Sequence, residues 1–286
     1  MAAPANQFNA LAAACDEWGA LLSPGAVVRS AEVLQRYGRT ILADAPAPAA
    51  ILRPTQAAQL PAILKVATAY QIPLYPISRG NNWGWGDACP TTEGQVILDL
   101  SALDHIIEIN EELGYVVVEP GVTQGQLVDA LARTNSNWWL DCTSAGRDTS
   151  LIGNILERGA TREERLSLVS GMQVVLADGT VLSTGYGHYP NSRVTHVAPR
   201  GIGPALDSLF SQSNFGIVTQ LALWLQPKPA HALLGNYTFS DDTLEGTIDA
   251  LRPFRIRGVI PGQPYPFRRS RRRAVGEAPV DRPKRP

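Results

Sequence analysis

The residues best suited to hold an anionic ligand lie between Pro76 and Pro90, in the stretch PISRGNNWGWGDACP. Glycine lets the backbone approach a ligand closely, and successive backbone N–H groups in such a loop form a concave surface that attracts anions. One arginine adds positive charge, two asparagines add amide donors, and two tryptophans offer flat surfaces. We therefore expect a pocket for a pyrophosphate and a planar ring. The residues proposed to form it are Arg79, Gly80, Asn81, Asn82, Trp83, Gly84, Trp85 and Gly86.

The alternative for this loop is a glycine-rich surface turn without a ligand. The two tryptophans argue against that interpretation, because large aromatic side chains are costly to leave in a mere turn. The loop also differs from the dinucleotide-binding GxGxxG pattern and from the GK[ST] phosphate loop, since neither motif opens a helix here.

A second polar stretch, Asp141–Gly159, reads DCTSAGRDTSLIGNILERG and is rich in hydroxyls and glycines. Such a run can hydrogen-bond a ligand through side chains and backbone alike, and an irregular connection is the alternative from residue types alone. The hydroxyl and glycine positions concerned are Thr143, Ser144, Gly146, Thr149, Ser150 and Gly153.

Taken in order, these segments resemble the vanillyl-alcohol oxidase and para-cresol methylhydroxylase flavoproteins, whose FAD-binding domain is called PCMH-type. In that family a glycine- and asparagine-containing loop wraps the FAD pyrophosphate, and an aspartate-ended strand (here Val96–Asp99) and an EPGV segment (here Glu119–Val122) follow. SLIGNILERG is similar to the family's S-[LV]-[GL]-GN-x-x-x-RG segment beneath the flavin. Phe215–Thr219, reading FGIVT, is similar to a strand start that touches the flavin or its ribityl chain.

The resemblance covers roughly Ala43 to Pro229, and it implies noncovalently bound FAD. Some relatives attach FAD through a histidine in the glycine-rich loop, but no histidine lies between Arg79 and Pro90. The further FAD-contacting positions that the resemblance implies are Pro120, Gly121, Asn154, Arg158, Gly159, Gly216, Ile217 and Val218.

One catalytic residue follows from the same resemblance. Relatives place an acidic residue near flavin N5, a little after the RG pair, and counting back from the shared SGM places Glu164 at that position, with Glu163 as its neighbour. The segment here is shorter than usual and lacks the family's aromatic and proline residues. The alternative is that Thr161–Arg165 is a solvated charged turn.

The function implied is hydride transfer from a para-substituted phenol, a small-molecule substrate, to flavin N5. An alternative within the oxidoreductases is a D-lactate or glycolate type of dehydrogenase acting on a 2-hydroxy acid. An alternative of another class is nucleic-acid binding through the basic tail RRSRRRAVGEAPVDRPKRP, since such a tract attracts phosphates. Specific nucleic-acid binding is not expected, and a second copy of the chain in a homodimer is a further candidate partner.

The resemblance implies an α+β fold, in which a small βαβ-containing part and a larger, mostly antiparallel sheet clasp FAD. A strand at Ala50–Arg53, a helix from Thr55 that Pro61 kinks or delays, and a strand at Ile72–Ile77 give the βαβ signal. Ligands bind at the carboxyl ends of such strands, where the glycine-rich loop begins.

Further elements follow from capping and turn residues. Thr123 predicts a helix start, and Asp178-Gly179 predicts a hairpin within Gly171–Ser183. The remaining elements expected are helices at Phe8–Leu22, Ser30–Tyr37 and Pro204–Phe210, strands at Val96–Leu100, Ile106–Ile109, Tyr115–Glu119 and Trp138–Leu140, and a loop at Gly185–Arg200.

Four regions are expected along the chain. They are an N-terminal helical segment (1–42), the PCMH-type domain (43–229), the start of a substrate domain (230–261) and a disordered basic tail (262–286). The substrate domain begins with a strand at His231–Phe239 and a helix at Asp241–Pro253 and then loses all periodicity, which suggests a C-terminal truncation. We therefore expect weak FAD binding and no efficient turnover by this chain alone.

Composition sets broad limits on the function. The chain has 286 residues and a net charge of −1, so its overall charge makes no case for nucleic acid or a membrane surface. Three scattered cysteines argue against a disulfide framework or a zinc site, and we expect no bound metal. No signal peptide and no membrane-spanning run of about 18 apolar residues is recognised, so we expect a cytoplasmic protein.

Overall fold

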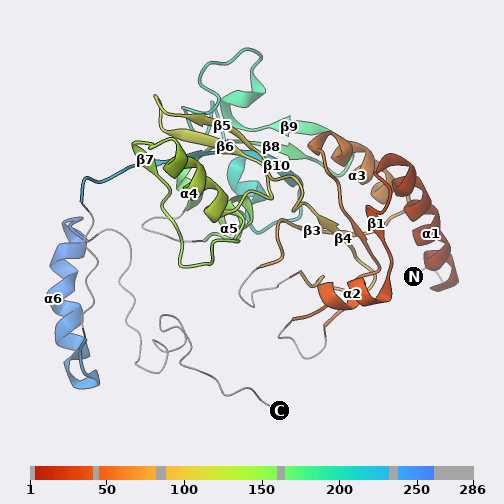
Figure 1. The fold of residues 1–286 in the computed structure, drawn as a ribbon, viewed down its shortest axis with the longest axis horizontal. Helices are drawn as coiled ribbons and strands as arrows, with labels where there is room; N and C mark the ends of the chain where they lie inside the picture. Colours follow the sequence, from red (N-terminus) through yellow and green to blue (C-terminus); the bar gives the residue numbers. More distant parts are fainter. Residues whose placement is uncertain (1–3, 41–44, 82–87, 160–164, 232–237, 261–286) are drawn as a thin grey trace. The chain divides into compact units, whose positions relative to one another are not determined.

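The computed structural model describes residues 4–40, 45–81, 88–159, 165–231 and 238–260. The chain divides into two units, Met1–Leu233 and Leu234–Pro286, which are described separately below (Figure 1). Among the described helices, none combines the length and the apolar character needed to cross a bilayer. The described residues likewise hold no group of three or more His, Cys, Asp or Glu side chains placed to bind a metal ion.

The first sheet of unit 1 has the strand order β1-β2-β4-β3, formed by Val27–Val28, Ala50–Leu52, Val96–Asp99 and Leu74–Ile77. Strands β2 and β3 both run parallel to β4, which lies between them, and β1 is antiparallel to β2. Helix α3 (Leu60–Ala69) connects β2 to β3. The predicted βαβ unit is therefore present, and a later strand is inserted between its two strands.

Helices cover both faces of this sheet. On one face α1 (Pro4–Leu21) packs against α3, and the fully buried Trp18 donates from its indole nitrogen to the carbonyl of Ile63 at 3.1 Å. On the other face α2 (Ala31–Tyr37) adds Val33, Leu34 and Tyr37 to a cluster with buried strand residues. The sheet therefore has an apolar core on each side, and its strand ends are left to carry polar loops.

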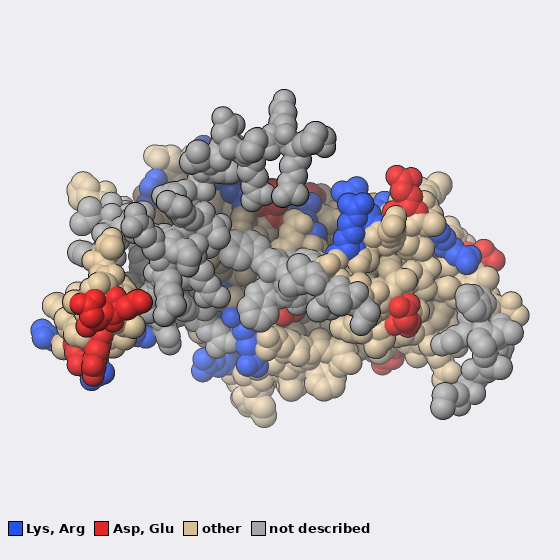
Figure 2. All heavy atoms as spheres, turned by 90° about the horizontal axis from the view of Figure 1, so that it is seen from below, with Lys and Arg blue, Asp and Glu red and all other residues tan. Residues whose placement is uncertain are grey.

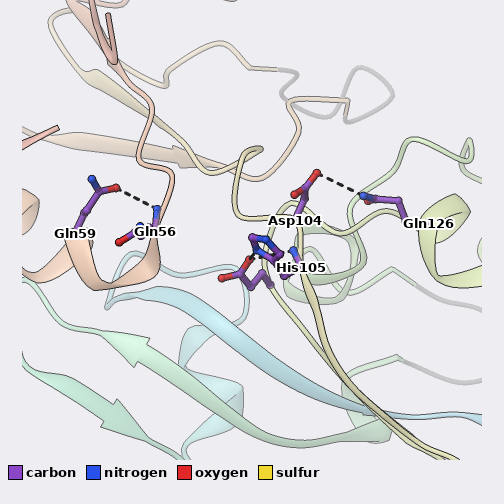
Figure 3. A network of polar contacts seen from close by, with 6 residues as sticks. Gln56, Gln59, Asp104, His105 and Gln126 are labelled. Atoms are coloured by element: carbon purple, nitrogen blue, oxygen red, sulfur yellow. Dashed lines mark hydrogen bonds and ion pairs between the residues drawn. The ribbon is translucent and has the colours of Figure 1, made fainter. Parts of the chain in front are cut away.

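The start of α3 differs from the prediction in its capping residue. The N-cap of α3 is Gln59, and Gln56 is the N-cap of the 3-10 turn before it; the backbone N–H of Gln56 donates to Oε1 of Gln59 at 3.1 Å (Figure 3). A short 3-10 helix, η1 (Ala57–Gln59), comes before α3, and Pro61 lies in the first turn of α3. Because proline has no N–H and fits only the first turn of a helix, Pro61 delays the helix, as the sequence predicted.

The second sheet of unit 1 is antiparallel, with the order β5-β6-β10-β8-β9. Helices α4 (Gln124–Arg133) and α5 (Leu151–Leu156) contribute Leu127, Leu131 and Ile155 to the apolar cluster of this sheet. The predicted hairpin is confirmed, with Gly179 at φ +84° in the turn between β8 and β9. The strands are β5 (Ile106–Asn110), β6 (Tyr115–Val118), β8 (Val169–Val175), β9 (Val181–Ser183) and β10 (Ile217–Trp224).

Smaller elements complete unit 1. Strand β7 (Trp138–Trp139) pairs with β11 (Gln226–Pro227). The predicted helix at Pro204–Phe210 is a 3-10 turn, η4 (Asp207–Phe210), and the predicted loop at Gly185–Arg200 begins with another, η3 (Gly185–His188). A further turn, η2 (Arg165–Leu168), leads into β8. The predicted α+β arrangement of a βαβ part and an antiparallel sheet is confirmed.

Unit 2 contains one described α-helix, α6 (Leu244–Ile256), which follows the 3-10 turn η5 (Asp241–Thr243). The helix predicted at Asp241–Pro253 is therefore confirmed, although none of its residues is buried. The strand predicted at His231–Phe239 falls mostly outside the described residues, and so does the basic tail.

Candidate functional site

A cavity of about 790 Å³ lies where three segments of unit 1 meet. We call it the main cavity. Its walls come from the end of β3 and the loop after it (residues 75–81), from the polar segment before and through α5 (143–159), and from the approach to β10 (210–218). The volume lies within the range of roughly 300–1,000 Å³ typical of small-molecule and cofactor sites.

Most of the described candidate residues lie on this cavity. The loop after β3, the hydroxyl-rich segment and the FGIVT segment all contribute, although more than 130 positions separate the first from the last in the sequence. The candidates that line the cavity are Arg79, Gly80, Asn81, Thr143, Ser144, Thr149, Ser150, Gly153, Asn154, Gly159, Gly216, Ile217 and Val218.

The other candidates are of two kinds. Pro120, Gly121, Gly146 and Arg158 are described and do not line the main cavity. Five loop residues and the candidate catalytic acid lie outside the described residues, so their roles stay predictions. These are Asn82, Trp83, Gly84, Trp85, Gly86 and Glu164.

The loop after β3 brings a cation to the cavity. Gly80 has φ +64°, and a Cβ there would lie only 2.8 Å from the Cβ of Ala88, so this tight backbone path requires glycine. The Nε atom of Arg79 is buried and has no hydrogen-bond partner among the residues that the structure describes. A buried guanidinium N–H needs an acceptor, which an anionic ligand in the cavity would supply.

Pro120 and Gly121 lie behind the cavity wall and position it. The Gly121 N–H donates to the carbonyl of Leu103 at 2.7 Å, and a Cβ on Gly121 would lie 2.7 Å from that same oxygen. The Pro120 carbonyl accepts the hydroxyl of Ser150 at 2.6 Å. The EPGV segment therefore supports Ser150, which lines the cavity, and does not face the cavity itself.

Arg158 does not line the main cavity, although its neighbours Glu157 and Gly159 do. Its backbone has φ +56°, and its Nε donates to the hydroxyl of Ser211 at 3.3 Å. That hydroxyl in turn donates to the carbonyl of Leu156 at 3.0 Å. Arg158 therefore ties the end of α5 to the segment that leads into β10.

Gln124 organises the hydroxyl-rich wall. Its side chain is almost fully buried, and its Oε1 accepts both the backbone N–H of Thr143 at 3.0 Å and the Thr143 hydroxyl at 3.2 Å. Its Nε2 donates to the carbonyls of Ala145 and Gly146 at 3.3 and 3.4 Å. One side chain at the start of α4 therefore fixes the path of residues 143–146.

The burial of Arg165 contradicts the alternative that Thr161–Arg165 is a solvated charged turn. Its side chain is only 1% exposed, and it reaches the backbone carbonyl of Asp141 and the side-chain oxygens of Gln124 and Asn154. Burial lowers the pKa of this guanidinium, although nearby Cys142 and Asp141 oppose that shift. Residues 160–164 lie outside the described part, so the correction concerns Arg165 alone.

A second polar network supports the start of α4 from outside the cavity (Figure 3). Thr123 caps the helix as predicted, since its hydroxyl accepts the N–H of Gln126 at 3.1 Å. Gln126 also donates to Asp104 at 3.5 Å. Next to Asp104, the backbone N–H and the ring Nδ1 of His105 contact Oε2 of Glu119 at 3.0 and 2.8 Å. The hydrogen bond to Glu119, with its negative charge, raises the pKa of His105.

Sequence reasoning missed several lining residues. Strand order was the available signal for Ser78 and Leu100, because these residues lie just beyond the carboxyl ends of the parallel strands β3 and β4. The polar run SQSN in front of FGIVT was the signal for the third wall. The remaining lining residues not proposed beforehand are Tyr75, Pro76, Ile77, Thr91, Ala145, Ile152, Leu156, Glu157, Phe210, Gln212, Ser213 and Asn214.

The FAD binding domain family matches residues 48–185 of this chain. Among curated proteins, the chain is 39% identical over 214 residues to 1'-carboxy-chondrochloren decarboxylase of Chondromyces crocatus, covering 73% of this chain and 40% of that protein. It is 36% identical over 255 residues to the 4-cresol dehydrogenase [hydroxylating] flavoprotein subunit of Pseudomonas putida, covering 87% of this chain and 49% of the subunit. Hydroxy-acid oxidoreductases are also matched, at 28–30% identity.

Among solved structures, p-cresol methylhydroxylase with substrate bound superposes with a TM-score of 0.83 at 34% sequence identity, covering 88% of this chain and 50% of that chain. The chain therefore spans about half the length of the relatives it matches.

Proposed function

Because the chain belongs to the flavoproteins that share a PCMH-type FAD-binding domain, we propose that its main cavity holds FAD noncovalently for the oxidation of a para-substituted phenol. When bound, the flavin would supply the hydride acceptor for this oxidation. The observation that carries the proposal is the buried Nε of Arg79, which lacks a partner among the described residues, in a cavity whose three walls come from the segments resembling this family.

The side chains of the main cavity suit FAD. Arg79 offers positive charge, and Asn81 and the hydroxyl-rich segment offer neutral donors for a pyrophosphate and a ribityl chain. Leu100, Ile152 and Phe210 add apolar surface for a ring system. A cavity with apolar walls and a few convergent polar groups is typical of cofactor sites.

Noncovalent binding is supported by the positions of the four histidines. All four are described, and none of them lines the main cavity. No cysteine is among the described lining residues either. The cavity wall described here therefore offers neither of these side chains for a bond to the cofactor.

Glu164 is the proposed acid near the reacting phenol. Its support is its position in the sequence, a short distance after the RG pair whose Gly159 lines the main cavity. A carboxylate there would accept or hold the phenolic proton during oxidation. The phenolic substrate is supported by the two relatives named for cresol.

Decarboxylation is a second candidate reaction. The relative from Chondromyces crocatus is named as a decarboxylase and shares 39% identity with this chain, more than the cresol dehydrogenase subunit shares. Release of CO₂ from a carboxylated substrate by the holoprotein, without oxidation of 4-alkylphenols, would favour this reaction. The 2-hydroxy-acid alternative has weaker support, because those relatives are less similar.

An FAD titration tests the proposal. Apoprotein is titrated with FAD while flavin fluorescence and the visible spectrum are followed, and the complex is then denatured in acid. We expect saturable binding and full release of unmodified FAD into the supernatant. Protein that takes up no FAD contradicts the proposed function, and flavin that stays with the precipitate contradicts noncovalent attachment.

Turnover by the 286-residue chain alone is proposed to be slow. An active site must exclude water and position the substrate, and this chain covers about half of the cresol-oxidising relatives. With 4-cresol and an artificial electron acceptor, we expect fewer than about 1 turnover per second. A faster steady-state rate from this chain would show that its own residues complete the site. A homodimer and a cytoplasmic location remain predictions.

A further inference from the structure

Arg165 lies outside the main cavity but contacts the residues that shape it. Its Nη1 donates to Oδ1 of Asn154 at 3.0 Å, and Asn154 lines the cavity on α5. Its Nη2 donates to Oε1 of Gln124 at 2.9 Å and to the Asp141 carbonyl at 2.6 Å, where the hydroxyl-rich wall begins. We propose that Arg165 is a positioning residue that holds two parts of the 143–159 wall, residues 143–146 and the end of α5, in the geometry that binds FAD. This inference rests on the proposed FAD binding.

Gln124 connects Arg165 to residues 143–146 of the wall through hydrogen bonds of its side-chain amide. The oxygen that accepts from Arg165 also accepts the N–H and the hydroxyl of Thr143. The same amide holds the carbonyls of Ala145 and Gly146 through Nε2. With its oxygen bound by Arg165, the amide cannot flip without losing contacts on both sides, so the path of residues 143–146 depends on Arg165.

Asn154 couples Arg165 to the second part of this wall, at the end of α5. The Asn154 side chain packs against Gly159, where any Cβ would collide with it, and the Gly159 N–H donates to the Asn154 carbonyl at 2.7 Å. Both residues line the main cavity. The hydrogen bond from Arg165 therefore fixes the amide that shapes the wall where α5 ends.

The guanidinium group suits this task better than an ammonium. Arginine presents its N–H donors in a rigid planar fork, whereas lysine has three donors on one nitrogen. Within the described chain, the Arg165 guanidinium donates to three acceptors on three separate segments. One acceptor is the backbone carbonyl of Asp141, and the other two are the side-chain amide oxygens of Gln124 and Asn154. Burying a cation among neutral acceptors is costly, which favours a role beyond packing.

The main test compares FAD affinity in three variants of the full chain. We expect Arg165→Met to raise the Kd for FAD about tenfold or more, since hydrogen bonds from a charged group are lost. Arg165→Lys is expected to recover little, because one ammonium cannot span the three acceptors. Arg133→Met is the matched control, because Arg133 is exposed in the last turn of α4, the helix that begins with Gln124, and does not line the main cavity. It should bind FAD as the wild type does.

A local readout separates positioning from general stability. Trypsin cleaves after Arg147, within the wall that Gln124 holds, and after Arg193, in a separate exposed loop. In apoprotein we expect Arg165→Met to speed cleavage at Arg147 several-fold and to leave cleavage at Arg193 unchanged, because only the first segment is released. Equal acceleration at both sites would mean global destabilisation and would overturn the proposal.

Gln124→Leu keeps the proposal testable if Arg165→Met does not fold. This variant removes the relay while leaving Arg165 in place, and it should also weaken FAD binding and expose Arg147 to trypsin. Where both single variants fold, the double variant should be little worse than either, since the two residues act in one network. Wild-type affinity in Gln124→Leu or in Arg165→Met overturns the inference, whereas a wild-type chain that binds no FAD overturns the proposed function instead.

Discussion

The Ser150 hydroxyl donates to the Pro120 carbonyl at 2.6 Å while it accepts the N–H of Gly153 at 2.9 Å. One hydroxyl thus caps α5 and joins it to the segment after β6. Backbone bonds reinforce the junction, since the Leu151 N–H donates to the Val122 carbonyl at 2.9 Å. The position of the α5 wall of the main cavity therefore depends on this junction.

Replacing Ser150 with alanine should weaken both the fold and FAD binding. The change removes an N-cap and leaves a buried carbonyl without its donor, which together cost about 1–3 kcal/mol of unfolding free energy. Urea unfolding of the apoprotein measures the loss, and an FAD titration measures the second effect. Ser150→Thr, which keeps the hydroxyl, is the control, and an alanine variant as stable as the wild type would contradict the structural role.

Arg79 should contribute to FAD affinity through its charge. Arg79→Met is expected to raise the Kd for FAD about tenfold to a hundredfold, because a charge-assisted hydrogen bond to an anion is lost. The salt dependence of binding should also become weaker. Arg36→Met is the control, since Arg36 lies in the last turn of α2 and does not line the main cavity. Unchanged affinity in Arg79→Met would remove the main support for the proposed site.

The pair formed by His105 and Glu119 should make stability depend on pH. Because Glu119 raises the pKa of folded His105, the stabilisation is fully present below the unfolded pKa of about 6.5. It is lost as the pH rises through the folded pKa. The stability difference between the wild type and His105→Gln should therefore shrink from pH 5.5 toward pH 9.

Urea unfolding at a series of pH values measures this difference, and NMR titration of the His105 ring checks the raised pKa directly. His188→Gln, a change in a distant loop, should leave the His105 titration as it is in the wild type. A wild-type minus His105→Gln difference that stays constant with pH would argue that the pair does not titrate as the contact implies.

Glu164 should affect the chemical step and not the binding of FAD. Glu164→Gln is expected to slow flavin reduction by 4-cresol about a hundredfold or more, as is typical when an acid–base group is removed. Anaerobic stopped-flow absorbance follows this single reduction even where steady turnover is slow. Glu163→Gln is the matched control one position earlier. If Glu163→Gln is the slower variant, the assignment from the sequence is displaced by one residue.

Local signals in the sequence predicted much of this fold. The capping box at Thr123, the delay of α3 by Pro61 and the hairpin at Asp178-Gly179 depend on neighbouring residues only, and each is present. The three walls of the cavity were also predicted, because their motifs occur in the order of a known family.

Features that depend on distant partners were not predictable in this way. Arg165 stands in a charged run, and its burial follows only from acceptors placed 11, 24 and 41 residues earlier. The first helical turn before α3 is η1, and its N-cap is Gln56 and not Thr55. Pro120 was expected to face the ligand, yet its carbonyl is bound by Ser150, thirty residues later. Residue types alone do not reveal such pairings.

The main cavity has a consequence for the protein as it leaves the ribosome. Its first wall begins in β3 and the loop that follows Ile77, but its last wall (210–218) ends in the first residues of β10, Ile217 and Val218. β10 is also the central strand of the antiparallel sheet, pairing with both β6 and β8. A nascent chain therefore exposes the glycine-rich loop long before the opposite wall has been synthesised, and cofactor capture must follow the emergence of β10.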